Sequence, residues 1–189
     1  MISKLSVEEF LARIAVDDLP GSGSVAALVG AAGLSQLMKI VKLSNIRLSG
    51  DAAIDSLPEL QSDITQIMEQ DVAVMKEALP LLLAIGADGD SKAWNAVLTK
   101  AAAVMFRLAE GCKQGLQIAQ ILLPVVSANL RCDIKAAALN CHAALQSSLL
   151  LAELNVSLLR EDDILSKQLL QKADMLAEAG ATSIDKLLT

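Results

Sequence analysis

The stretch that decides the fold reads Leu19-Pro20-Gly21-Ser22-Gly23-Ser24-Val25-Ala26-Ala27-Leu28-Val29-Gly30-Ala31-Ala32-Gly33. Its first part joins a stiff proline to two glycines and ends at Ser24, a residue type that often caps the N-terminus of a helix. Its second part is apolar and consists mostly of very small residues. The stretch therefore predicts a sharp turn that leads into a helix beginning at about Ser24.

Two interpretations of this turn stay open. The first N–H groups of a helix have no partner within the helix, and together with the helix dipole they favour an anion or a polarised carbonyl. Gly21, Gly23 and Ser24 are therefore candidate ligand-binding residues. The plainer interpretation is a tight turn into a closely packed core helix, and composition alone favours it, because glycine-rich turns are common.

The predicted helix from Ser24 to Ser44 has a nearly bare side, where Ala26, Gly30 and Gly33 lie. A glycine inside a helix costs on the order of 1 kcal/mol relative to alanine, so two of them need a reason. We expect close approach by another backbone, from a neighbouring helix or from a partner subunit. Because 53% of the 189 residues are hydrophobic, we also expect a homodimer that buries some helix faces.

Composition excludes several function classes. The net charge is −6, and phosphate neutralisation needs a basic surface, so we expect no nucleic-acid partner. A transmembrane segment is not expected either, because the most apolar uncharged run, residues 136–152, contains several polar side chains. With a single histidine, His142, the chain is not expected to form a histidine-based metal site. The three cysteines lack the spacing of a zinc site, and no signal peptide is visible at the N-terminus. We therefore expect reduced thiols and a cytoplasmic location.

The rest of the chain shows helical periodicity and no alternating strand pattern. A short helix follows the Ser6–Glu9 capping box. A long helix begins after Ser56, and Pro80 together with the loop of residues 86–90 ends it. Further helices are predicted over residues 92–111, 116–126, 129–160, 162–179 and 183–188. The prediction is an all-α single domain, residues 1–189, with a bundle of about six to seven helices.

A few polar side chains lie on helices made mostly of alanine and leucine. They are Asp71, Asn129, Asp133, His142 and Asn155. Buried polar groups need partners, so each is a candidate either for a helix–helix hydrogen bond or for a site. For each residue taken alone, the helix–helix hydrogen bond is the favoured interpretation.

The motif Pro20 to Leu28 resembles the N-terminal signature of the cyclodeaminase/cyclohydrolase family. That family includes the C-terminal domain of formiminotransferase-cyclodeaminase and single-domain methenyltetrahydrofolate cyclohydrolases. The resemblance extends to Asp71 in the third helix, to Asp133 before an alanine-rich helix with Asn129 four residues earlier, and to Asn155-Val156. Arg47 remains from a lysine-rich family segment after the second helix.

The resemblance implies an up-and-down, cyclodeaminase-like helical bundle that acts as a homodimer on a tetrahydrofolate derivative, without a metal or a further cofactor. The implied activity is formimidoyltetrahydrofolate cyclodeaminase or methenyltetrahydrofolate cyclohydrolase. Both reactions need proton transfer, for which Asp133 and Asp71 are the candidate catalytic residues. The candidate substrate-binding residues are Gly21, Gly23, Ser24, Asn129, Arg47 and Asn155.

An alternative function stays open beside the enzyme. Ser22, Met105 and Cys132 stand where the family usually has glycine, proline and serine. These differences favour a catalytically impaired relative that acts as a folate-binding or helical assembly module.

Overall fold

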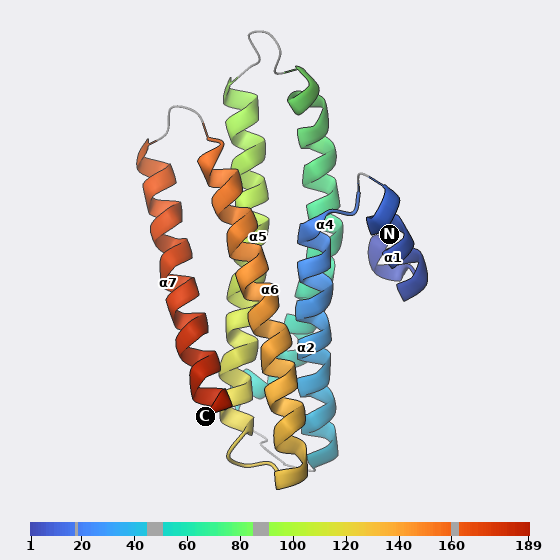
Figure 1. Ribbon diagram of the computed structural model, residues 1–189, viewed down its shortest axis with the longest axis vertical. Helices are drawn as coiled ribbons and strands as arrows, with labels where there is room; N and C mark the ends of the chain where they lie inside the picture. Colours follow the sequence, from blue (N-terminus) through green and yellow to red (C-terminus); the bar gives the residue numbers. More distant parts are fainter. Residues whose placement is uncertain (18, 45–50, 85–90, 160–162) are drawn as a thin grey trace.

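The computed structural model describes residues 1–17, 19–44, 51–84, 91–159 and 163–189. Five long helices run up and down in the order α2 (Ser22–Ser44), α4 (Leu57–Ala84), α5 (Ser91–Leu122), α6 (Arg131–Ser157) and α7 (Asp163–Leu188). Each runs opposite to the one before it (Figure 1). Short elements complete the order: η1 (Ile2–Lys4), α1 (Val7–Val16), α3 (Ala52–Asp55) and η2 (Ala128–Leu130). The predicted all-α bundle of about six to seven helices is confirmed, since the described residues contain seven α-helices and no strand.

Helix α2 packs against α4, α5 and α6. Its glycines explain how it fits there. A Cβ atom on Gly33 would lie 2.9 Å from the backbone oxygen of Ala137 on α6, and one on Gly30 would lie 2.9 Å from the Cys112 sulfur on α5. The close approach predicted for the bare side of α2 therefore comes from neighbouring helices of the same chain.

Two predicted helix ends were wrong, and glycine misled the prediction at each. Helix α5 runs without a break through Gly111 and Gly115, where side chains of α4 and α2 occupy the space of the missing Cβ atoms. Helix α7 continues past Gly180, which is buried against Leu145 of α6. Helix α4 ends at Ala84, between Pro80 and the predicted loop of residues 86–90. In this bundle, helical glycines permit close packing between helices rather than ending a helix.

By length and composition alone, α2 could cross a membrane, since its most apolar window has a mean hydropathy of 1.5. Half of that window is buried inside the bundle, as the core helix of a folded domain would be. The sequence prediction had singled out residues 136–152 as the most apolar run instead.

Helix α1 stands beside the bundle, next to the start of α2 (Figure 1). Its Ser6–Glu9 capping box is present as predicted, with the Ser6 side chain accepting from the Glu9 backbone and the Glu9 side chain accepting from Ser6. Phe10 is the residue of α1 that is buried. The peptide bond between Leu19 and Pro20 is cis, and α2 begins two residues later.

Candidate active site

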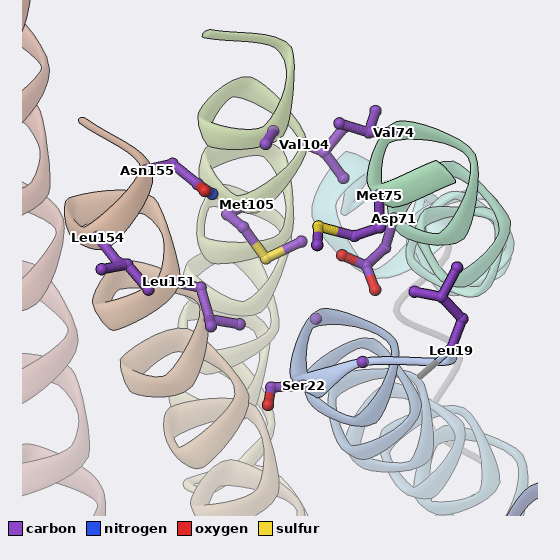
Figure 2. Close-up of a pocket in the computed structure, with 13 residues that line it drawn as sticks. Leu19, Ser22, Asp71, Val74, Met75, Val104, Met105, Leu151, Leu154 and Asn155 are labelled. Atoms are coloured by element: carbon purple, nitrogen blue, oxygen red, sulfur yellow. The ribbon is translucent and has the colours of Figure 1, made fainter. Parts of the chain in front are cut away.

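A cavity of about 230 Å³ opens at the start of α2. It is bounded by the first turn of α2, the middle of α4 and of α5, and the last turns of α6 (Figure 2). Its lining residues are Leu19, Gly21, Ser22, Gly23, Asp71, Val74, Met75, Ala101, Val104, Met105, Leu151, Leu154 and Asn155. Among the residues that the structure describes, Asp71 is the one charged residue in this lining, which is otherwise mainly aliphatic side chains and methionine.

Asp71 is held by Ser24. Helix α2 begins at Ser22, so Ser24 lies inside its first turn, and the prediction that Ser24 is the N-cap was wrong. The Ser24 side chain is completely buried, and its hydroxyl donates to Oδ2 of Asp71 at 2.8 Å. The carbonyl oxygen of Met68 lies 3.2 Å from the same hydroxyl.

The carboxyl group of Asp71 occupies the place that we had predicted for an external anion. The sequence suggested that the first turn of α2 would hold an anionic or carbonyl group of a ligand. In the structure, that turn faces the Asp71 carboxyl group of α4, to which the Ser24 hydroxyl donates a hydrogen bond. The first turn of α2 therefore orients an acidic side chain of the chain itself.

The setting of Asp71 favours its protonated form. The side chain is only 9% exposed. Burial raises the pKa of Asp71, since it disfavours the charged form, while hydrogen bonding from the hydroxyl and backbone N–H of Ser24 partly lowers it; the net pKa is raised. A carboxyl group with a raised pKa is suited to general acid–base catalysis.

Gly23 makes room for this carboxyl group. A Cβ atom on residue 23 would overlap Oδ1 of Asp71, and it would lie 2.7 Å from Cγ of Asp71 and 2.9 Å from Cε of Met105. Gly21 also lines the cavity, but a Cβ atom there would meet nothing within 4 Å. The requirement for glycine is therefore steric at Gly23 and is not explained by packing at Gly21.

Asn155 faces the cavity from α6, on the side opposite Asp71, with the side chains of Met75 and Met105 between them (Figure 2). Of the predicted site residues, Gly21, Gly23, Ser24, Asp71 and Asn155 come together here. The sequence analysis missed the apolar lining, in particular Met75 and Leu151. Their helical spacing was visible, but it is also typical of core residues.

The structure does not bring Asn129 and Asp133 to this cavity. Both side chains are exposed at the opposite end of the bundle, where α6 begins. Along α6, Asp133 and Asn155 are separated by roughly 33 Å at 1.5 Å per residue. The expectation that Asp133 lies in an apolar setting was wrong, because its side chain is exposed. Arg47 lies outside the described residues.

His142 lies between α6 and α7, away from the cavity. Its ring is 3.4 Å from the Gln146 side chain. Burial lowers the pKa of His142, and the negative charge of Asp185 partly opposes this effect. In the part of the chain that the structure describes, His142 and the cysteine and acidic side chains form no group of three that could hold a metal ion.

Comparison with known proteins agrees with this fold. A family model described as formiminotransferase-cyclodeaminase matches residues 6–175, and the chain therefore belongs to the formiminotransferase-cyclodeaminase family. In fold it is similar to formiminotetrahydrofolate cyclodeaminase from Thermotoga maritima, with a TM-score of 0.86 over 99% of this chain and 96% of that chain. The two sequences are 17% identical, so this similarity concerns the fold alone. No curated protein sequence gives a significant match.

Proposed function

We propose that this protein is a folate one-carbon enzyme, a formimidoyltetrahydrofolate cyclodeaminase or a methenyltetrahydrofolate cyclohydrolase, with Asp71 as its acid–base residue. The observation that carries the proposal is the buried Asp71 carboxyl group, with its raised pKa, in an otherwise apolar cavity. Membership of the family supports the folate substrate.

The chemistry of both reactions fits such a carboxyl group. Each reaction converts a carbon that lies between two nitrogens. In ring closure, one nitrogen attacks the formimidoyl carbon, and the amino group on that carbon is protonated and leaves as ammonia. A protonated Asp71 would act as the acid for this step. In hydrolysis, water attacks the methenyl carbon and loses a proton, so an ionised Asp71 would act as the base.

The charge of the ligand also fits. The methenyl form carries a positive charge shared by two nitrogens, and Asp71 is the only charged side chain in the described lining. A carboxylate in a poorly hydrated cavity interacts more strongly with such a cation than it would in water. This complementarity applies to both reactions, because the methenyl compound is the product of one and the substrate of the other.

The test is the absorbance of methenyltetrahydrofolate, followed as it forms from the formimidoyl compound and as it is hydrolysed. We expect Asp71→Asn to lower the rate by about 10²-fold or more, because the acid–base group is lost. The control is Asp174→Asn, an exposed position on α7, which should retain the wild-type rate. Full turnover by folded Asp71→Asn would contradict the assignment.

Asp133→Asn examines the second catalytic candidate from the sequence. Asp133 lies in the first turn of α6, where a carboxylate complements the helix dipole, and the N-cap Leu130 provides no side-chain hydrogen bond. We expect Asp133→Asn to lose a few tenths of a kcal/mol in stability and no activity. A large loss of turnover in folded Asp133→Asn would move the proposed site to the other end of the bundle.

The alternative proposal is a catalytically impaired relative that binds folate. Two of the sequence differences behind it, Ser22 and Met105, lie in the lining of the cavity. Calorimetric binding of a tetrahydrofolate derivative by the wild-type protein, with no change in methenyl absorbance, would favour this alternative over the enzyme.

We also propose a cytoplasmic homodimer. The small-residue side of α2 is already covered within the chain, so the dimer needs another surface. The exposed side of α6 provides one, because Leu139, Leu150 and Leu154 are each about half exposed or more and no charged residue occurs over residues 136–152. An apolar groove between α2 and α6, lined by Val25, Val29 and Leu150 among others, continues this surface.

A further inference from the structure

The hydroxyl of Ser24 has a single hydrogen and two acceptors within reach. Oδ2 of Asp71 is 2.8 Å away and the carbonyl oxygen of Met68 is 3.2 Å away. The side chain is completely buried, so water does not compete for this hydrogen. Which acceptor receives it determines which oxygen of Asp71 can take up a proton.

The two acceptors differ in their need for this bond. Met68 lies inside α4, where its carbonyl accepts from the backbone N–H four residues later, as in any helix interior. Oδ2 of Asp71 has no such helical donor, and an unpaired buried carboxylate oxygen is costly. Both the shorter distance and this difference favour the bond from Ser24 to Oδ2.

The other oxygen, Oδ1, lies against the first turn of α2. It occupies the space that a Cβ atom on Gly23 would need, and Gly23 and Asp71 both line the cavity. Oδ1 is therefore placed beside the cavity, whereas Oδ2 is bound to a buried side chain.

We propose that Ser24 is a positioning residue that holds Oδ2 of Asp71 in both protonation states, so that Oδ1 is the oxygen that exchanges a proton with the substrate. The exchange itself rests on the proposed function, but the hydrogen bond does not. When Asp71 gains a proton, it forms an O–H bond at Oδ1 while Ser24 continues to donate to Oδ2. When that proton leaves, no buried group has to change its partner.

Within the described ranges, the charged side chains near Asp71 have partners elsewhere or face solvent. On α4, Glu69 accepts hydrogen bonds from Ser3, and Glu77 pairs with Lys100 of α5. Lys76 is exposed.

The described parts of the other helices around Asp71 add no charge to the cavity lining. Arg107 of α5 donates to Gln70. Glu153 of α6 is partly exposed and does not line the cavity. Helix α2 carries no charged residue before Lys39. The titration of Asp71 should therefore report mainly its burial and its bond to Ser24.

The experiment is carbon-13 NMR of the ligand-free, isotope-labelled protein over a range of pH. The Asp71 carboxyl signal gives its titration midpoint, and the backbone carbonyl signal of Met68 shows whether Ser24 changes acceptor. As Asp71 titrates, we expect the Met68 signal to shift by the same amount in wild type and in Ser24→Ala, because only the field of the Asp71 charge acts on it. We expect Ser24→Ala to move the Asp71 midpoint to higher pH, since a bond that favours the carboxylate is removed.

The matched control is Ser148→Ala. Ser148 is equally buried, but its hydroxyl donates to the carbonyl oxygen of Leu145 on its own helix. This variant should leave the Asp71 midpoint unchanged, so a merely structural effect of removing a buried hydroxyl is separated from an effect on Asp71.

Two results would overturn the inference. One is a Met68 response in wild type that Ser24→Ala abolishes, because Ser24 would then turn to Met68 as Oδ2 takes the proton. The other is an Asp71 midpoint that Ser24→Ala does not move. Neither measurement needs turnover, so an inactive protein would refute the proposed function without touching this inference. In an active protein, the pH profile of kcat/KM should move in Ser24→Ala as the NMR midpoint does.

Discussion

Gly23, in the first turn of α2, lies so close to the carboxyl group of Asp71 on α4 that no Cβ atom fits between them. Residue 23 would place its Cβ 2.7 Å from Cγ of Asp71, well inside ordinary van der Waals contact. The glycine of the sequence motif and the buried acid are therefore one structural unit. A change at either residue acts on the other.

Gly23→Ala should destabilise the fold by about 1–3 kcal/mol, because Asp71 or Met105 must move to admit the methyl group. Gly21→Ala is the matched comparison for stability, since a Cβ atom at residue 21 meets nothing within 4 Å. Urea denaturation of the two variants measures the difference. Equal stability of both variants would show that the first turn of α2 yields without cost.

The stability of the protein should depend on pH through Asp71. Because the folded-state pKa of Asp71 is raised, the folded protein binds this proton more tightly than the unfolded chain. The contribution to stability is therefore full below the unfolded-state pKa and decreases as the pH rises through the folded-state pKa.

Asp71→Asn removes this titration. The stability of Asp71→Asn relative to wild type should therefore be greater at pH 7 than at pH 4. Denaturant titrations of both proteins at the two pH values measure the change. Asp174→Asn, at an exposed site, should show no comparable dependence on pH. A relative stability of Asp71→Asn that falls between pH 4 and pH 7 would mean that Asp71 is stabilised as the carboxylate.

Thiol reagents should distinguish the three cysteines, which are all free in the structure. Burial raises the pKa of Cys141 to about 12, and it raises the pKa of Cys112 as well. Cys132, in the first turn of α6, is exposed. We expect one thiol per native chain to react rapidly at pH 8, and Cys132→Ser to abolish that reaction. Rapid labelling of Cys112 or Cys141 would indicate that the bundle opens on the time scale of the reaction.

The proposed dimer surface on α6 can be tested with one charge. Leu150→Glu should shift the protein to monomer, because it places a carboxylate in an apolar interface. Met175→Glu is the control, since Met175 on α7 has the same exposed fraction as Leu150, 66%. Light scattering at micromolar concentration measures the mass of each. A wild-type monomer would refute the dimer, and a dimer of Leu150→Glu would place the interface elsewhere.

The periodicity of the sequence determined the class of fold. Runs of leucine, alanine, valine and isoleucine at helical spacing need a buried face, and only neighbouring helices can provide it here. The motif from Pro20 to Ala27 indicated the turn before α2 and its close packing. Asp71 stood out because a carboxylate on an apolar stripe needs a partner.

Only the tertiary structure decided what those residues do. A sequence cannot show whether a helical glycine ends a helix or admits a neighbour, because the answer depends on atoms from other helices. Gly115 and Gly180 illustrate this, since Leu34 and Leu145 fill the space beside them. From the sequence, Asp71 and Asp133 were both candidate catalytic residues. Packing separates them, because it buries Asp71 against Ser24 and leaves Asp133 in solvent at the other end of the bundle.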